Sequence, residues 1–232
     1  MEPFPSRHAV SGEGRPRAPW LGIALNVLLP LVLMGLAWGD PRAFFGSPFY
    51  AAAAGLFVLP NLVAIVFTTG YGPHQRPSGE SPWVLASANL VSNLGMLITV
   101  WLDARGLWRM PGGDTVRIVG LGVFAAGTAL RVATMMALGR MFSLRVSVEP
   151  DHRLVTDGFY RFVRHPSYTS VIVLCTGIAL AYRSWFWVAL IPSMIFGLTR
   201  RMATEEKFLL EHFGEEYRAY MARTKRLLPG IY

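Results

Sequence analysis

The chain has 232 residues, of which 53% are hydrophobic and only 16% are charged. A soluble domain carries about 25% charged residues, and the mean hydropathy of +0.38 also disfavours a soluble globular enzyme. Lys and Arg outnumber Asp and Glu by 22 to 14, and in so apolar a chain this excess indicates an anionic membrane surface rather than nucleic acid. The single cysteine, Cys175, excludes an internal disulfide and a multi-cysteine zinc site.

The chain begins with a polar tail, residues 1–19, which is rich in Pro, Arg, Gly and Ser and is predicted to be disordered. The first apolar run, residues 20–39, contains no charge. It is longer than the apolar part of a signal peptide and contains Pro30, so we do not interpret it as a cleaved signal.

Six long apolar runs predict an all-α integral membrane protein with about six transmembrane helices, because about 20 apolar helical residues cross a bilayer. The alternative, buried helices in a soluble core, would leave too little polar surface. The last two runs are 16 residues each and are separated by Arg183 alone, so they are expected to form a tight antiparallel hairpin over 167–199. The runs are residues 20–39, 49–69, 83–102, 118–138 (interrupted only by Arg131), 167–182 and 184–199.

The distribution of basic residues predicts the orientation of the chain. With six crossings, one side of the membrane holds 16 basic residues and the other holds 5. Cytoplasmic segments are enriched in Lys and Arg, so both termini are expected in the cytoplasm. The chain then divides into a cytoplasmic tail (1–19), a four-helix transmembrane region (20–138) and a C-terminal region (139–232) that carries the chemistry.

The segment 149–168 is polar, is broken by Pro150, Gly158 and Pro166, and lies between two apolar runs. Pro166 suits the first turn of a helix, whose free N–H groups can bind a carboxylate or phosphate. His165 and Tyr168 are one helical turn apart where the chain enters the predicted hairpin. For the nearby Arg161 and Arg164, the alternative is a basic loop that binds lipid head groups.

Beyond the hairpin, Arg201 and Glu205 lie four residues apart on one face of a predicted helix that ends near Gly214. A second amphipathic helix is expected to continue to Arg226 at the membrane surface. From their spacing alone, Arg201 and Glu205 could form only a surface salt bridge, worth about 0.5 kcal/mol.

Residues 140–232 also carry several short motifs in a fixed order. They are Leu154-Val-Thr-Asp-Gly-Phe-Tyr160, Arg164-His-Pro-Ser-Tyr168 and, after the predicted hairpin, Glu205-Glu206, Phe213-Gly-Glu-Glu-Tyr217 and Leu228-Pro229. In order and approximate spacing this half of the chain resembles the isoprenylcysteine carboxyl methyltransferase family. The phospholipid N-methyltransferases share a looser version of the pattern.

The resemblance implies an integral membrane methyltransferase that uses S-adenosyl-L-methionine, with the cofactor held by cytoplasmic C-terminal helices. Arg201 matches the residue at the acceptor carboxylate, and is the expected catalytic and substrate-binding residue. The family commonly has glycine where this chain has Ser170, a change expected to alter helix packing beside the cofactor. The residues that match the family's cofactor-binding positions are His152, Arg153, Leu154, Val155, Tyr160, His165, Pro166, Ser167, Tyr168 and Glu205.

The chemistry of methyl transfer fits these residue types. An in-line displacement at a sulfonium needs no metal, and a carboxylate acceptor is already ionised at neutral pH, so it needs no general base. An arginine binds a carboxylate bidentately, and alignment of the two reactants lowers the barrier by several kcal/mol. The resemblance implies that the acceptor is a lipophilic carboxylate of the isoprenylcysteine type, bound beside the lipid bilayer; no nucleic acid and no metal are expected.

Other functions stay open from the sequence. The acceptor could be a phospholipid amine or a small thiol, and for an amine Glu206 or His212 could remove the proton. A sterol-reductase-like membrane enzyme is a more distant alternative. The non-enzymatic alternative is a small transporter or an assembly factor, which would not bind the cofactor.

Overall fold

The computed structural model describes residues 21, 23–69, 76–77, 82–139, 147–148 and 154–230. The predicted disordered tail lies outside these residues. The all-α class is confirmed, because the described chain is helical apart from short connections and two strands of two residues each. The elements are η1 (Ala24–Leu28), α2 (Leu29–Trp38), α3 (Pro41–Gly46), α4 (Pro48–Thr69), β1 (Arg76–Pro77), α5 (Pro82–Ala104), α6 (Gly113–Leu138), β2 (Ser147–Val148), η3 (Gly158–Arg161), α7 (Pro166–Ala181), α8 (Trp185–Phe213) and α9 (Glu215–Arg223).

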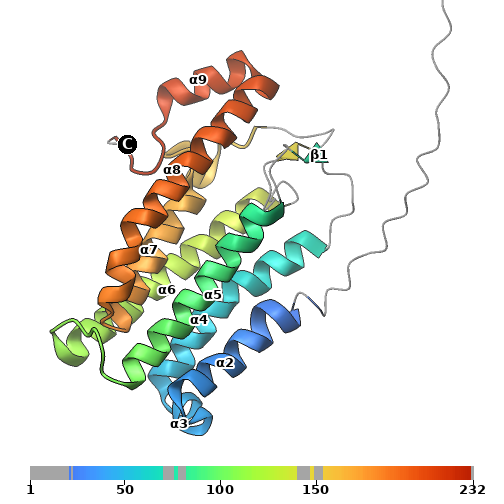
Figure 1. Ribbon diagram of the computed structural model, residues 1–232. Helices are drawn as coiled ribbons and strands as arrows, with labels where there is room; N and C mark the ends of the chain where they lie inside the picture. The colour runs from blue at the N-terminus through green and yellow to red at the C-terminus, as the bar shows by residue number, and fades with distance from the viewer. Residues whose placement is uncertain are drawn as a thin grey trace, which may run out of the picture.

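The long helices form one elongated bundle, and α8 extends beyond the others to carry α9 at one end (Figure 1). Helix α6 packs most extensively against α7, while α2 packs on α5, α4 on α6, and α7 on α8. Residues 182–184 join α7 to α8, so the chain reverses within three residues. Helix α8 does not end at the boundary of the apolar run at 199, but continues without a break to Phe213.

Among the described residues, two helices are long and apolar enough to cross a membrane by length and composition, namely Pro48–Val66 and Gly113–Leu138. Ala24–Trp38 and Pro166–Ala181 are shorter apolar helices. Only about a third of each of the two candidate spans is buried inside the protein. An apolar helix that leaves most of its surface uncovered differs from the core helix of a soluble protein, whose apolar side chains are buried.

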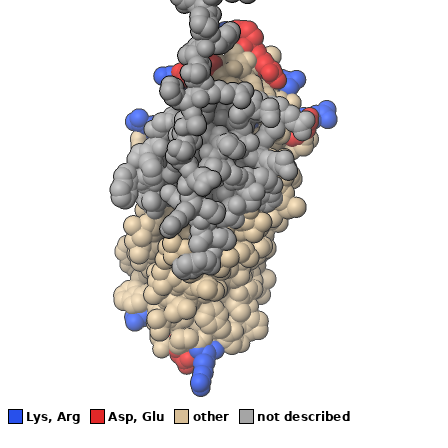
Figure 2. Space-filling view, turned by 90° about the vertical axis from the view of Figure 1, so that its right-hand side faces the viewer, with Lys and Arg blue, Asp and Glu red and all other residues tan. Residues whose placement is uncertain are grey.

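Large apolar side chains point outward from several helices. Charged side chains gather at the two ends of the molecule in Figure 2, and the uncovered part of the face between them is free of charge. This apolar band between polar ends is the surface that a bilayer requires. The exposed large apolar side chains of the helices include Leu25, Leu28, Val32, Leu36, Leu62, Val66, Leu94, Ile98, Ile118 and Val119.

Glycine allows α6 and α7 to approach closely. A Cβ atom added at Gly127 would lie 2.5 Å from the backbone nitrogen of Leu174, and one added at Gly120 or Gly177 would also collide with the facing backbone. Small residues let helices pack backbone to backbone, which is typical of helix pairs in membranes. This packing sets the distance between α6 and the start of α7, where the predicted site residues lie.

A buried carboxylate ties the helices together at the end of the bundle away from α9. Asp103, near the end of α5, is 2% exposed and accepts a hydrogen bond of 2.8 Å from the Tyr50 hydroxyl of α4. It also forms ion pairs with Arg117 of α6 and with Arg109 of the α5–α6 connection. A buried charge is tolerated only when it is paired in this way.

The other end of the bundle carries a short pairing of distant segments. Arg76 pairs with Val148 and Pro77 with Ser147 in an antiparallel arrangement of β1 and β2. The connections between α4 and α5 and between α6 and α7 therefore meet at the same end of the molecule.

Candidate functional site

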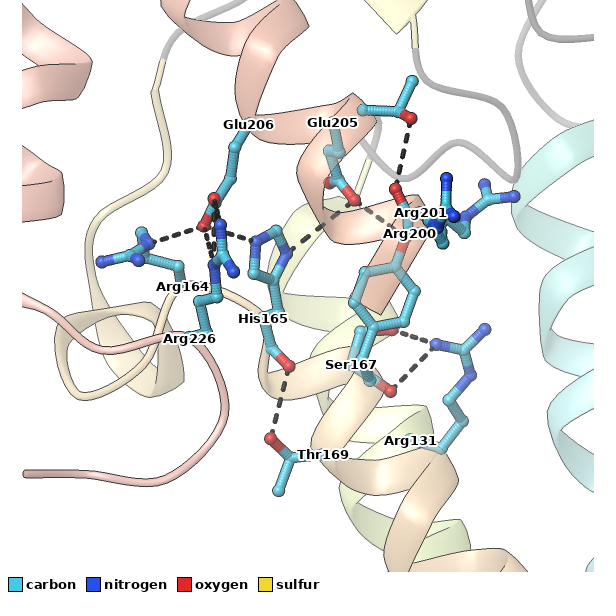
Figure 3. A network of polar contacts seen from close by, with 12 residues as sticks. Arg131, Arg164, His165, Ser167, Thr169, Arg200, Arg201, Glu205, Glu206 and Arg226 are labelled. Atoms are coloured by element: carbon cyan, nitrogen blue, oxygen red, sulfur yellow. Dashed lines mark hydrogen bonds and ion pairs between the residues drawn. The ribbon is translucent and has the colours of Figure 1, made fainter. Parts of the chain in front are cut away.

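The site forms where α7 begins, against the second half of α8. Pro166 occupies the first position of α7 and His165 precedes it, so the motif Arg164-His165-Pro166 lies directly at the helix N-terminus. Proline favours this position because its fixed φ suits a helix and it lacks an N–H. Figure 3 shows His165 facing Glu205 and Glu206 from α8, and Ser167 facing Arg131.

Tyr168 links the two charged residues that the sequence placed on one face of α8. Its hydroxyl donates a hydrogen bond of 2.8 Å to Oε2 of Glu205 and accepts one of 2.9 Å from Nε of Arg201. Glu205 keeps 30% of its side chain exposed. The three side chains therefore form an ordered chain, and Arg201 is held through Nε.

Glu206, the next residue, is buried in a cluster of positive charge. Its side chain is only 4% exposed. Arg164 donates to Oε1 at 2.9 Å, and Arg226 donates to Oε2 from Nε at 3.0 Å and from Nη2 at 2.6 Å. Nε2 of His165 lies 3.3 Å from Oε1. Burial alone would raise the pKa of Glu206, but hydrogen bonds from His165, Arg226 and Arg164 outweigh it and lower this pKa to about 2.

The C-terminal segment closes one side of the site through backbone hydrogen bonds. The N–H groups of Arg164 and His165 donate to the carbonyls of Lys225 and Arg226 at 2.7 and 2.9 Å. The Thr169 hydroxyl donates to the Leu227 carbonyl at 2.9 Å. Residues 164–169 are thus fixed from both α8 and the chain end.

The preceding turn is anchored by α9. The Tyr220 hydroxyl donates a hydrogen bond of 2.6 Å to the carbonyl of Tyr160 in η3. Burial raises the pKa of Tyr220 to about 12, so this hydroxyl stays protonated and available as a donor at neutral pH. Tyr160 itself is 8% exposed. Helix α9 therefore positions the segment that leads into the site.

Arg131 of α6 reaches the start of α7 from the other side. Its Nη1 donates to the hydroxyl and, at 3.3 Å, to the carbonyl of Ser167. The same carbonyl accepts a hydrogen bond of 2.6 Å from the fully buried Ser170 hydroxyl. The serine that replaces the family's glycine is thus accommodated as a local helix hydrogen bond, with its oxygen directed back to Ser167.

The structure brings together most, though not all, of the predicted site residues. Tyr168 contacts both Glu205 and Arg201, and His165 lies 3.8 Å from Glu205. Pro166 and Ser167 lie in the first turn of α7, next to Tyr168. Tyr160 lies in η3, before the start of α7, and Leu154 and Val155 are half-buried in the segment before η3. His152 and Arg153 lie outside the described residues. The binding roles of all ten cofactor residues stay predictions.

Four residues at the site were not among the predicted cofactor- and substrate-binding residues: Arg131, Arg164, Glu206 and Arg226. From the sequence, Glu206 was a possible base, Arg164 belonged to a motif or contacted a lipid head group, and Arg131 and Arg226 had no role. The presence of a lone charge, Arg131, in an apolar run was the clearest available signal, since ionisable residues within membrane helices are usually functional. The contact of Arg131 with α7 lies beyond what sequence spacing can indicate.

Comparison with known proteins places the chain in a family. A profile of the isoprenylcysteine carboxyl methyltransferase family matches residues 119–211. A protein-S-isoprenylcysteine O-methyltransferase from Tribolium castaneum is 32% identical over 237 aligned positions, which cover 93% of this chain and 75% of that protein. The enzyme of the same name from Schizosaccharomyces pombe is 32% identical over 114 residues, 48% of each chain. The human enzyme is 32% identical over 127 residues, which cover 49% of this chain and 41% of the human one.

The fold and the site define an all-α protein with an apolar band and a polar site at one end. The chain belongs to the isoprenylcysteine carboxyl methyltransferase family, a family of membrane proteins. For several of the relatives the similarity is confined to one part. The chain spans 48% of the length of the Schizosaccharomyces pombe protein and 62% of that of its Oryza sativa relative.

Proposed function

We propose that this protein is an integral membrane methyltransferase that transfers a methyl group from S-adenosyl-L-methionine to the carboxylate of an isoprenylcysteine-like acceptor. The observation that carries the proposal is the Arg201–Tyr168–Glu205 chain, which presents a guanidinium and a carboxylate side by side at the start of α7. The names of the relatives support the acceptor class.

The residues present fit the cofactor's amino-acid moiety, which carries one carboxylate and one ammonium. The N-terminus of α7, with Pro166 in its first position, offers a partial positive charge to a carboxylate, while the N–H groups of Tyr168 and Thr169 donate to the carbonyl of His165. Glu205, partly exposed beside it, is an acceptor for an ammonium or for ribose hydroxyls. When bound, S-adenosyl-L-methionine supplies a methyl group on an electrophilic sulfonium.

The other substrate is served by Arg201 in this proposal. Its Nε donates to the Tyr168 hydroxyl, which fixes the plane of the guanidinium, and a guanidinium held in one plane suits the planar geometry of a carboxylate. A carboxylate is a nucleophile at neutral pH without a base, so orientation and exclusion of water are the main tasks of the protein. The apolar band beside the site suits an acceptor that carries a long hydrocarbon chain.

The surroundings of Glu206 argue against an amine acceptor. An amine must lose its proton before or during attack, and Glu206 was one candidate base. Its carboxylate is occupied by Arg164, Arg226 and His165, and its pKa of about 2 makes it a very weak base at neutral pH. The other candidate, His212, lies seven residues beyond Glu205 on α8, about 10 Å along the helix axis.

The test is methyl transfer by the purified protein in lipid nanodiscs, with radiolabelled S-adenosyl-L-methionine and three acceptors: N-acetyl-S-farnesylcysteine, an aminophospholipid and a small thiol. The proposal predicts label in the farnesylcysteine, and label there should disappear when the acceptor's carboxylate is replaced by an amide. If the protein binds the cofactor but transfers the methyl group only to the lipid amine or the thiol, the proposed methyltransferase activity stands and the proposed carboxylate acceptor is refuted. No cofactor binding by a folded protein would refute the enzyme.

We also propose six membrane crossings, with α7 and the first part of α8 as the last, hairpin pair and both termini in the cytoplasm. The meeting of β1 with β2 supports it, because an odd number of crossings between them would separate these segments. The single native cysteine, Cys175, is buried, so introduced cysteines can be labelled selectively. In intact cells an impermeant thiol reagent should modify Arg42→Cys and spare Arg223→Cys; both positions are exposed. Labelling of Arg223→Cys from outside would refute this orientation.

A further inference from the structure

His165 lies between two carboxylates that have different surroundings. Nε2 is 3.3 Å from Oε1 of the buried Glu206, and Nδ1 is 3.8 Å from Oε2 of the partly exposed Glu205. His165 itself is 4% exposed and is held at its backbone by Arg226. The ring therefore has one nitrogen directed into the protein and the other directed to the site (Figure 3).

Glu206 can serve His165 only as an acceptor. Its pKa of about 2 keeps it ionised at neutral pH, and an ionised carboxylate has no proton to donate. A neutral imidazole carries its proton on one nitrogen and accepts at the other. In the neutral ring the proton that faces Glu206 is then on Nε2, which leaves Nδ1 as an acceptor.

We propose that Glu206 is a positioning residue, which acts through His165 by fixing the tautomer in which Nδ1 is the acceptor that faces the site. Nδ1 and Oε2 of Glu205 then converge as two acceptors, and such a pair is completed by a donor from a ligand, either an ammonium or a pair of hydroxyls. The role of this pair of acceptors rests on the proposed function, because the ligand would be the amino-acid or ribose part of the cofactor. The tautomer itself does not rest on it.

Glu206 connects two distant segments of the chain in addition to forming ion pairs. Arg164 and Arg226 come from the segments on either side of the site, so Glu206 joins the start of α7 to the C-terminal segment. Arg164 holds Oε1, the oxygen that faces His165, and so orients the carboxylate toward the ring, whereas the shorter contacts of Arg226 are with Oε2. A fixed second partner is the usual way in which a protein selects a histidine tautomer.

The experiment compares three variants by nitrogen-15 NMR of histidine-labelled, ligand-free protein and by calorimetric binding of S-adenosyl-L-methionine. The signal of His165 is assigned with His165→Gln. Wild type should be protonated on Nε2. Glu206→Gln retains an acceptor and should keep this tautomer, with a two- to threefold weaker affinity. Glu206→Met removes the acceptor and should mix the tautomers and weaken the affinity at least tenfold, which corresponds to about 1.4 kcal/mol.

Arg226→Gln is the matched control, because it removes a partner of Glu206 and leaves the contact between Glu206 and His165 in place. It should lower the melting temperature as Glu206→Gln does, but it should retain the Nε2–H tautomer. The inference is overturned if wild type is protonated on Nδ1, or if Arg226→Gln disturbs the tautomer as much as Glu206→Met. If Glu206→Met fails to fold, the wild-type and Arg226→Gln spectra still decide. A protein with the expected tautomer that does not bind the cofactor would refute the proposed function and leave the tautomer assignment standing.

Discussion

Replacing Tyr168 by Phe removes one oxygen atom and two hydrogen bonds from the site. The hydroxyl donates to Glu205 at 2.8 Å and accepts from Arg201 at 2.9 Å, and both partners are charged. Hydrogen bonds to charged groups contribute about 1.5–3 kcal/mol each when buried. Since Glu205 is partly exposed, water replaces some of that loss, and we expect the lower end of the range for the pair.

The expected result is a loss of 10- to 100-fold in the rate of methyl transfer, equivalent to about 1.4–2.8 kcal/mol in the barrier. Without the hydroxyl, Arg201 and Glu205 are free to pair directly, one helical turn apart, and the guanidinium is drawn away from the acceptor. Stability should fall by about 1.5 kcal/mol, the lower end of the range for these hydrogen bonds, because the ring still fills its place. Turnover with N-acetyl-S-farnesylcysteine and thermal unfolding in detergent measure the two effects separately.

Tyr217→Phe is the matched control. Its hydroxyl is buried and has no hydrogen-bond partner among the described residues, so its removal should leave stability and turnover nearly unchanged. If Tyr168→Phe is as active as Tyr217→Phe, the Arg201–Tyr168–Glu205 chain does not orient the acceptor and the reasoning is refuted.

Three further experiments test the packing of α6 on α7, the buried ion pairs of Asp103 and the charge of Glu206. Gly127→Leu should separate α6 from α7 and lower the free energy of unfolding in detergent by more than about 2 kcal/mol. Gly122→Leu, whose Cβ would meet no described atom within 4 Å, should be tolerated. Equal stability of the two variants would contradict the close packing. Asp103→Asn leaves Arg117 without its charged partner and should destabilise the protein by about 2–4 kcal/mol while the affinity for S-adenosyl-L-methionine, measured calorimetrically, stays within twofold. The pKa of Glu206 in the folded protein is below its ordinary value of 4.5, so the ionised carboxylate contributes stability above about pH 4.5 that is lost as the pH falls toward 2. Acid unfolding should show a loss of up to about 3 kcal/mol in the free energy of unfolding in this window. A Glu206→Gln variant that keeps the full pH dependence would show that Glu206 is not its source.

The sequence by itself determined the helical class, the apolar character of the bundle and the order of the motifs. These properties depend on local composition and periodicity, which a single chain displays directly. It also placed Arg201 and Glu205 on one helix face and His165 at a helix entry, because the helical repeat relates residues three or four apart. The resemblance to the family rested on the same short-range order of residues and is confirmed.

Only the tertiary structure decided which side chains from distant segments meet. Glu206 is followed by a lysine and preceded by Glu205, and nothing in that order distinguishes the partly exposed carboxylate from the buried one. The distinction arises because Arg164 and Arg226, 42 and 20 residues away along the chain, converge on Glu206. In the same way, the reach of Arg131 to Ser167 depends on the close packing of α6 against α7. Burial and pairing are properties of the assembled helices, so the charge states and orientations at the site follow from packing rather than from spacing.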